Sequence, residues 1–195
     1  MKIHYTPWIG ENYGAANVTG TRLLVLGESH YGDGDPDATV RYTQAYVDGQ
    51  NHRFWTSIMQ LVLGRPGYEI DRREFWHSVS FYNFIQEPVG DGPRWRPTSE
   101  MWARSQGPFE EVLNELKPRR ILVLGAALWD NLPSFGRQGR GLHALGEPKD
   151  TWIYPYAGGE ALSTWVFHPS SPKGANTLSV HPYVKELIRS RAPNR

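Results

Sequence analysis

The chain has 195 residues, long enough to bury a hydrophobic core without disulfides or oligomerisation. It contains no cysteine, which excludes disulfides, thiol catalysis, iron–sulfur clusters and cysteine-based zinc sites. Its formal net charge of +1 argues against a dedicated nucleic-acid-coating protein, but neither requires nor excludes a site for nucleic acid.

In chain order, the first residues, MKIHYTPWIG, lack the apolar segment of a signal peptide, and no later window is apolar enough to span a membrane. We therefore expect a cytoplasmic protein with no membrane association. Farther along, four short apolar runs each precede a polar or glycine-containing turn. They predict buried strands over 22–26, 78–82, 120–124 and 164–167.

Helical periodicity occupies the stretches between these strands. It predicts helices over 54–64, 71–77, 99–116 and 182–191. Ser99 is the expected N-cap of the third helix, and Pro118 is expected to stop it. The glycine- and proline-rich stretches 32–37 and 133–148 are expected to be surface loops.

Strands that alternate with helices predict an α/β fold. We expect a three-layer α/β/α arrangement with a central, mostly parallel four-stranded sheet, in a single domain over 1–195. A further extended segment, 151–154, is expected to form an antiparallel hairpin with the run that includes Thr164, at the sheet edge. No internal repeat or composition break marks a second domain.

Polar residues gather where the predicted strands end. GESHYGDGD follows the first strand, the second ends at Asn83, and HPSSPKG follows the fourth. In an open α/β sheet, ligands bind outside the carboxyl ends of the strands, because the strand-to-helix turns converge there. We therefore expect Gly27, Glu28, Asn83 and His168 to meet at one rim of the sheet.

These motifs, in this order, resemble those of the uracil-DNA glycosylase superfamily over about residues 22–190. In LLVLGESHY, Gly27 and Glu28 match the GE of the superfamily's GEAPG turn, and Tyr31 matches the tyrosine of its GQDPYH version. VSFYN places Asn83 where an asparagine reads the base edge, and Phe54 in HRFWTSIMQL matches the phenylalanine that stacks on the flipped base.

The last motif of the superfamily, commonly HPSP or HPSA, is matched by HPSS. It comprises His168, Pro169, Ser170 and Ser171. The segment PRRILVLGAALWDNL is similar to the superfamily's structural strand and helix. The resemblance implies a monomeric DNA glycosylase, independent of metals and cofactors, that acts on DNA containing a damaged or deaminated base.

The resemblance also implies a role for each matched residue. Asn83 would pair with the N3 hydrogen and O4 of a pyrimidine, Phe54 would stack on the ring, and Tyr31 would exclude a methyl group at C5. His168, with backbone amides of the Gly27 turn, would stabilise the anionic leaving base. Phosphate contacts would come from Ser170, Ser171 and Lys173.

Some positions depart from the superfamily patterns. Ser29 stands where the GQDPYH version has a water-activating aspartate, so Glu28 is assigned the role of general base, with Asp33 and Asp35 as alternatives on the same loop. His30 replaces a proline. The iron–sulfur branch that shares the GE turn is excluded as a full match, because its cluster requires four cysteines.

Other interpretations stay open. Because Ser29 replaces a carboxylate, the protein could be a catalytically silent nucleic-acid or nucleobase-binding protein of the same fold. The near-neutral charge also permits hydrolysis of a free nucleoside or nucleotide. Asn83 could be a turn residue and His168 a core histidine. A serine hydrolase is disfavoured because GESHY lacks the final glycine of a nucleophile elbow.

Overall fold

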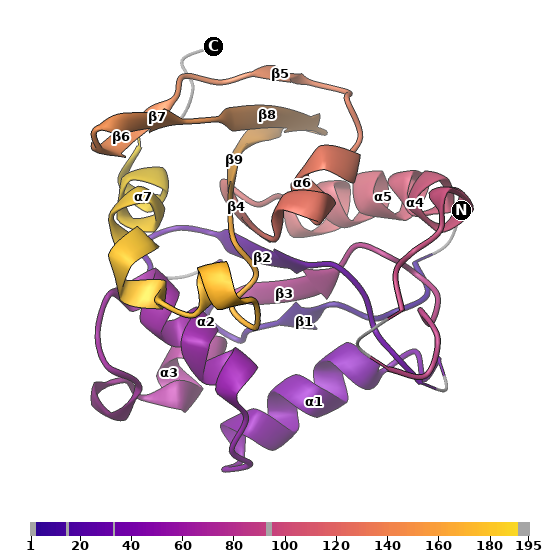
Figure 1. The fold of residues 1–195 in the computed structure, drawn as a ribbon, viewed down its shortest axis with the longest axis horizontal. Helices are drawn as coiled ribbons and strands as arrows, with labels where there is room; N and C mark the ends of the chain where they lie inside the picture. The colour runs from indigo at the N-terminus through magenta and orange to yellow at the C-terminus, as the bar shows by residue number, and fades with distance from the viewer. Residues whose placement is uncertain (1–2, 15, 33, 93–94, 191–195) are drawn as a thin grey trace.

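The structure, a computed structural model, describes residues 3–14, 16–32, 34–92 and 95–190. Seven strands form one mixed sheet in the order β1-β3-β2-β4-β9-β8-β5 (Figure 1). Its centre consists of four parallel strands: β3 (Ser80–Asn83), β2 (Leu23–Gly27), β4 (Arg120–Leu124) and β9 (Gly159–Val166). The α/β class and the four predicted strands are therefore confirmed.

The prediction of a four-stranded sheet is wrong, because three antiparallel strands extend it. These are β1 (Trp8–Ile9), β8 (Thr151–Tyr156) and β5 (Arg137–Gln138). β1 and β5 have two residues each, too few to show an alternating pattern in sequence. The predicted antiparallel hairpin is confirmed, since β8 pairs with β9 in a register that places Thr151 opposite Thr164.

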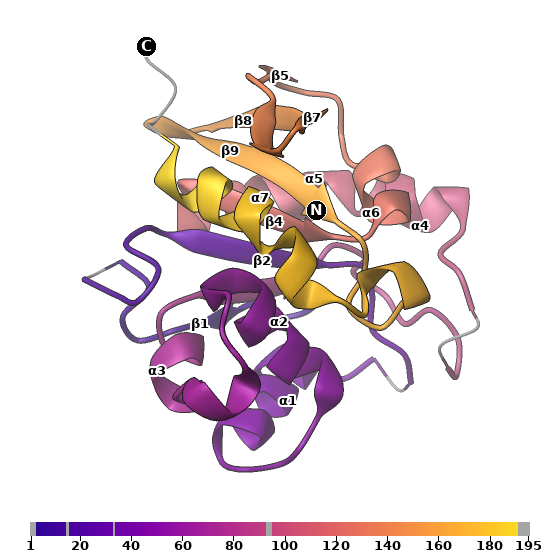
Figure 2. The ribbon, with the colours of Figure 1, turned by 60° about the vertical axis from the view of Figure 1, so that its left-hand side comes forward.

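Helices cover both faces of the sheet (Figures 1 and 2). One face carries α1 (Ala38–Val47), α2 (Arg53–Leu63), α3 (Arg72–Trp76) and α7 (Thr177–Arg189). The other carries α4 (Ser99–Arg104), α5 (Gln106–Leu116) and α6 (Ala126–Asn131). The short elements are the 3-10 turns η1 (Gly67–Glu69) and η2 (Pro172–Gly174) and the hairpin of β6 (Leu142–Leu145) with β7 (Glu147–Lys149).

The central strands are apolar on both faces because both faces are covered. In β2, Leu23 and Val25 pack into the cluster with α2, α3 and α7, whereas Leu24 and Leu26 pack into the cluster with α5. Side chains alternate between the two faces of a strand, so a strand buried on both sides reads as a continuous apolar run. By the same alternation, Gly27 and Asn83 belong to the face covered by α1 and α2.

The predicted helix boundaries need correction at several points. The single helix expected over 99–116 is two helices that meet at Ser105, and Thr98 rather than Ser99 caps the first by accepting a hydrogen bond from the Met101 amide at 3.3 Å. Gly107 and Pro108 explain the break, because both favour a helix start over a helix interior.

The structure also differs from the prediction at the start of α7 and in the stretch 133–148. α7 starts at Thr177, capped by Asn176, and contains Pro182, which the sequence pattern had placed at its start. Residues 133–148, expected to be a surface loop, contain β5, β6 and the first two residues of β7. Within the described part of the chain, no helix is both long and apolar enough to cross a membrane.

Candidate functional site

The carboxyl ends of β2 and β3 lie side by side, and Gly27 pairs directly with Asn83. A Cβ added to Gly27 would lie 2.2 Å from Asn83 Oδ1 and 3.0 Å from Phe81 Cζ. The Asn83 amide therefore lies across the end of β2, in the space that a side chain at position 27 would fill. Gly27 is required here because of this close approach.

Asn83 is hydrogen-bonded to a second buried polar residue, His30. Asn83 Nδ2 lies 2.9 Å from His30 Nε2, and Thr39 Oγ1 in α1 lies 2.7 Å from the same nitrogen. Burial lowers the pKa of His30 to about 4, an effect that Asp35 only partly opposes, so the imidazole is neutral near pH 7. With Asn83 Nδ2 facing the ring, as in this structure, His30 Nε2 is the acceptor and the ring proton lies on Nδ1.

Backbone hydrogen bonds fix the GESHY turn against the chain that follows β3. Phe84 N donates to Gly27 O at 3.0 Å, Ile85 N to Glu28 O at 2.9 Å, and Val89 N to His30 O at 3.0 Å. The side chains of the turn are therefore attached to backbone that three hydrogen bonds hold in place, as a preorganised site requires.

Glu28 is paired with Arg96, which lies outside the sequence motifs. Glu28 Oε1 lies 3.3 Å from Arg96 Nη1, and the two side chains are 14% and 74% exposed. Burial raises the pKa of Glu28, although the charge and hydrogen bond of Arg96 oppose the rise. The carboxylate is thus enclosed while its guanidinium partner faces solvent.

His168 stands at the same rim, after the end of β9. Its ring stacks on Phe54 of α2, with centroids 5.2 Å apart and planes inclined by 15°. The Ser170 amide donates to His168 Nδ1 at 3.2 Å. Burial, and secondarily the charge of Arg96, lowers the pKa of His168. The neutral ring accepts through Nδ1, so its proton lies on Nε2, which is therefore a hydrogen-bond donor.

The rim thus brings together most of the residues selected from the sequence. The Phe54 ring links the end of β2 to His168. Its centroid is 5.2 Å from that of His168 and 6.1 Å from that of Phe81, the ring that approaches Gly27. The charge of Arg96 acts on both Glu28 and His168. Asn83, Glu28 and His168 therefore belong to one connected region.

Other selected residues have structural roles or lie farther out. Ser171 Oγ accepts from the Gly174 amide at 3.1 Å and donates to His168 O at 2.7 Å, so this hydroxyl closes the loop. Ser170 acts on His168 through its amide, and its side chain is exposed. Ser29 is half-buried and Tyr31 is 38% exposed.

The two alternative carboxylates of the first loop are Asp33 and Asp35. Asp33 lies outside the described residues. Asp35 pairs with Arg41 at 2.7 Å and accepts from the Asp37 amide at 3.0 Å, and these contacts lower its pKa. Asp35 therefore organises the start of α1. Lys173 places its ammonium over the Phe167 ring, 5.3 Å from the centroid.

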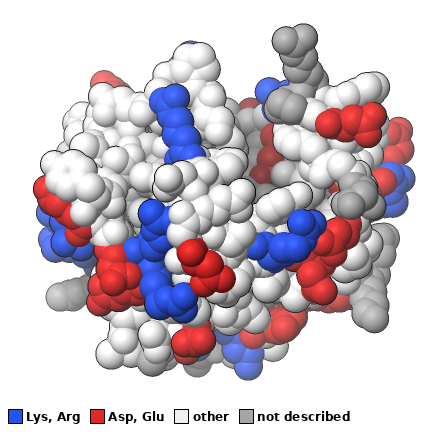
Figure 3. All heavy atoms as spheres, turned by 90° about the horizontal axis from the view of Figure 1, so that it is seen from below, with Lys and Arg blue, Asp and Glu red and all other residues white. Residues whose placement is uncertain are grey.

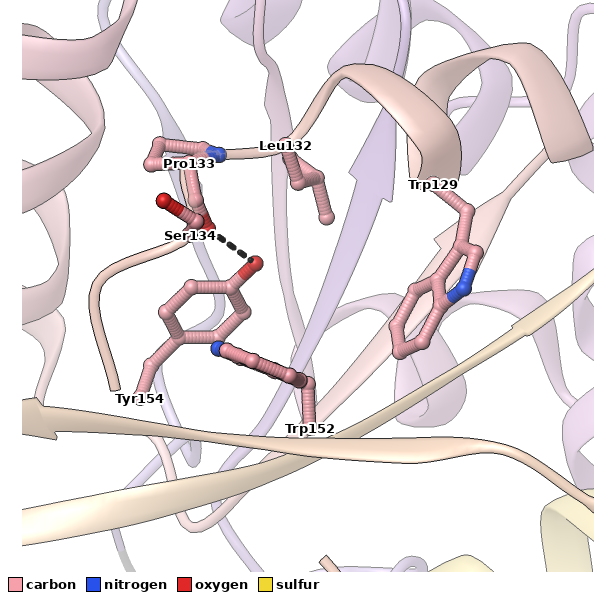
Figure 4. A pocket seen from close by; sticks show the side chains of 6 residues that line it. All are labelled: Trp129, Leu132, Pro133, Ser134, Trp152 and Tyr154. Atoms are coloured by element: carbon pink, nitrogen blue, oxygen red, sulfur yellow. Dashed lines mark hydrogen bonds between the residues drawn. The ribbon is translucent and has the colours of Figure 1, made fainter. Parts of the chain in front are cut away.

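Two hollows lie away from this rim. One, of about 180 Å³, lies between α6 and β8, where Tyr154 donates to Pro133 O at 3.1 Å (Figure 4). Its lining consists of Trp129, Leu132, Pro133, Ser134, Trp152 and Tyr154. The other lies beside Asn12, Asn17 and Ser78. None of the selected site residues lines either hollow.

The charge distribution is mixed on the face formed by the underside of Figure 1. Figure 3 shows Lys and Arg side chains next to Asp and Glu side chains on this face, with no broad patch of one sign. Within the described ranges, no cluster of three or more His, Asp or Glu side chains is placed to hold a metal ion. At the rim itself, Arg96 is the basic residue that contacts Glu28.

A scan against protein-family models finds no match to this chain, and a search of curated proteins finds none either.

Proposed function

We propose that this protein is a DNA glycosylase of the uracil-DNA glycosylase superfamily, with that superfamily's three-layer fold over 1–195. It hydrolyses the N-glycosidic bond of uracil or a related deaminated base in DNA and acts as a monomer. The observation that supports this proposal most strongly is the placement of Asn83, Phe54 and His168 at one rim, with a glycine where a side chain would block the approach to Asn83.

Base recognition falls to Asn83 and Phe54. A base inside a duplex is inaccessible, so a glycosylase flips the nucleotide out and reads its hydrogen-bonding edge. The Asn83 side chain offers an acceptor and a donor, which complement the N3 hydrogen and O4 of uracil. Phe54, at the start of α2, supplies an aromatic face for stacking, worth about 1–3 kcal/mol per base.

Stabilisation of the leaving group falls to His168. When the bond between C1′ and the base breaks, the electron pair remains on the base, which leaves as an anion. A neutral imidazole with its proton on Nε2 can donate a hydrogen bond to that anion, and the Ser170 amide fixes this tautomer. Loss of one such donor costs on the order of 2.7–4 kcal/mol in barrier height.

Activation of water falls to Glu28. Its carboxylate takes a proton as the water oxygen bonds to C1′, and burial makes it a stronger base than an exposed glutamate. In the free protein Arg96 pairs with it. Because Arg96 is largely exposed, a phosphate of bound DNA can take over the guanidinium and free the carboxylate for this role.

A second candidate is a silent nucleobase-binding protein that uses the same rim residues. It is favoured by Ser29 at the position of an activating aspartate and by the engagement of Glu28 with Arg96. The two candidates agree on binding and differ on turnover.

Oligonucleotides with one uracil, single- and double-stranded, separate the candidates. Base release is measured by alkaline cleavage of the abasic sites. We expect cleavage by the wild-type protein and a loss of a hundredfold or more in His168→Ala. The exposed His143 provides the matched control, because His143→Ala should keep full activity. Binding without release of any deaminated base would support the silent protein. Unchanged turnover in His168→Ala would remove His168 from the mechanism.

A further inference from the structure

The hydrogen bond between Asn83 and His30 restricts which way the Asn83 amide can face. We propose that His30 is a positioning residue that locks the Asn83 amide in one orientation, and so limits the proposed site to bases with an N–H next to a carbonyl, excluding cytosine. This inference rests on the proposed function, because it concerns the base that the same site accepts.

The lock follows from the chemistry of His30 Nε2. This nitrogen carries a single lone pair and lies within hydrogen-bond distance of both Asn83 Nδ2, at 2.9 Å, and the Thr39 hydroxyl, at 2.7 Å. Both partners can donate to it. Rotation of the Asn83 amide by half a turn would place Oδ1, which also carries lone pairs, against Nε2. While the ring proton is on Nδ1, the rotated state would replace a hydrogen bond by a contact between two lone pairs.

The imidazole itself is held in place. His30 is 8% exposed, and its ring lies 4.6 Å from that of Tyr5, measured between centroids. Its carbonyl accepts from the Val89 amide at 3.0 Å, which fixes the backbone at this residue. Thr39 has no exposed surface. The ring therefore cannot turn aside to accommodate a rotated Asn83.

The locked amide leaves a defined set of groups for a ligand. One Nδ2 hydrogen is donated to His30, so the second hydrogen and Oδ1 remain. No described residue donates to Oδ1, which lies over Gly27. An acceptor beside a donor complements the N3–H and O4 of uracil, and likewise the N1–H and O6 of hypoxanthine. Cytosine presents the reverse pattern and would require the rotated amide.

The variant His30→Gln tests the lock without removing the contact. A glutamine amide can both accept and donate, so either orientation of Asn83 would find a partner. We expect the ratio of kcat/KM for uracil over cytosine to fall by on the order of tenfold or more, measured on matched oligonucleotides. Thr39→Val is the control, because it removes a hydroxyl but leaves the Nε2 lone pair, so its ratio should equal that of the wild type.

A merely structural role would lower both rates in His30→Gln and leave their ratio unchanged, which would overturn the proposal. If the wild type releases no base at all, the proposed function fails, and the lock is decided separately by ¹⁵N–¹H spectra of the labelled wild-type protein. A His30 proton on Nδ1 with Nε2 unprotonated supports the lock. A proton on Nε2 near pH 7 overturns it.

Discussion

The buried, neutral state of His30 makes the stability of the fold depend on pH. In the unfolded chain the ring has an ordinary pKa of 6.5, whereas burial lowers the pKa to about 4 in the folded protein. Between these values the unfolded chain binds more protons, so stability falls as pH decreases through 6.5 towards 4, and the effect of His30 disappears about one pH unit above 6.5. The full difference corresponds to about 3 kcal/mol, of which about 2 kcal/mol is lost by pH 5.

A comparison of the wild type with His30→Gln isolates this contribution, because glutamine fills the site without titrating. Urea unfolding followed by circular dichroism, at constant ionic strength between pH 5 and pH 8, gives the free energy of unfolding of each. We expect the wild type to lose about 2 kcal/mol more than the variant over this range. His143→Gln, at an exposed position, should follow the wild-type curve. A constant difference between wild type and His30→Gln at all pH values would show that His30 is not held neutral.

Three further predictions concern the same rim. Gly27→Ala introduces a Cβ 2.2 Å from Asn83 Oδ1, and should lower the free energy of unfolding by about 1–3 kcal/mol and reduce uracil release, as measured by urea unfolding and oligonucleotide cleavage. Arg96→Gln should weaken DNA binding and reduce the salt dependence of log Kd by about one, measured by fluorescence anisotropy; an unchanged slope would show that Arg96 contacts no phosphate. The triple variant Asn83→Leu, His30→Phe and Thr39→Val replaces all three members of the buried polar cluster by apolar groups. Its free energy of unfolding should lie within about 1 kcal/mol of the wild type, yet it should release no uracil; retained release would exclude Asn83 as the base reader.

The position of the rim could be predicted from sequence because the burial of the central strands determines where each apolar run ends. The central strands are covered on both faces, so each reads as an apolar run that stops abruptly at a polar residue. Gly27 and Asn83 were identified in this way, and parallel pairing makes their ends coincide. The periphery could not be predicted by the same reasoning, since the two-residue strands β1 and β5 show no pattern of their own.

Helix α1 shows why one part of the site was missed. Its buried face includes Thr39 and Thr43, which are polar, so the apolar periodicity that marks a surface helix is absent. Thr39 faces His30, and Thr43 donates to the Thr39 carbonyl at 2.8 Å. The buried threonines of α1 therefore have two effects. They remove the apolar periodicity that would predict the helix, and one of them, Thr39, bonds to His30.

His30 and Arg96 were missed for a different reason. His30 departs from the motif in which it stands, and it contacts an asparagine 53 positions away along the chain. Arg96 belongs to a loop, 68 positions from Glu28, and scattered arginines are common on protein surfaces. Both contacts depend on the register of β2 against β3 and on loop paths, which local patterns in the sequence do not encode.

The polar groups at this rim are difficult to explain by stability alone. Position 83 ends a strand whose four residues are all buried, where an apolar side chain would contribute packing without a hydrogen-bonding requirement. Instead the chain holds an asparagine there, keeps a histidine neutral to pair with it, and omits a side chain at Gly27 to make room for it. The buried asparagine and the neutral histidine both have hydrogen-bonding requirements that apolar side chains lack, and all three features concern the same amide. Departures from good packing that converge on one group are expected where that group binds a ligand, which agrees with the role proposed for Asn83.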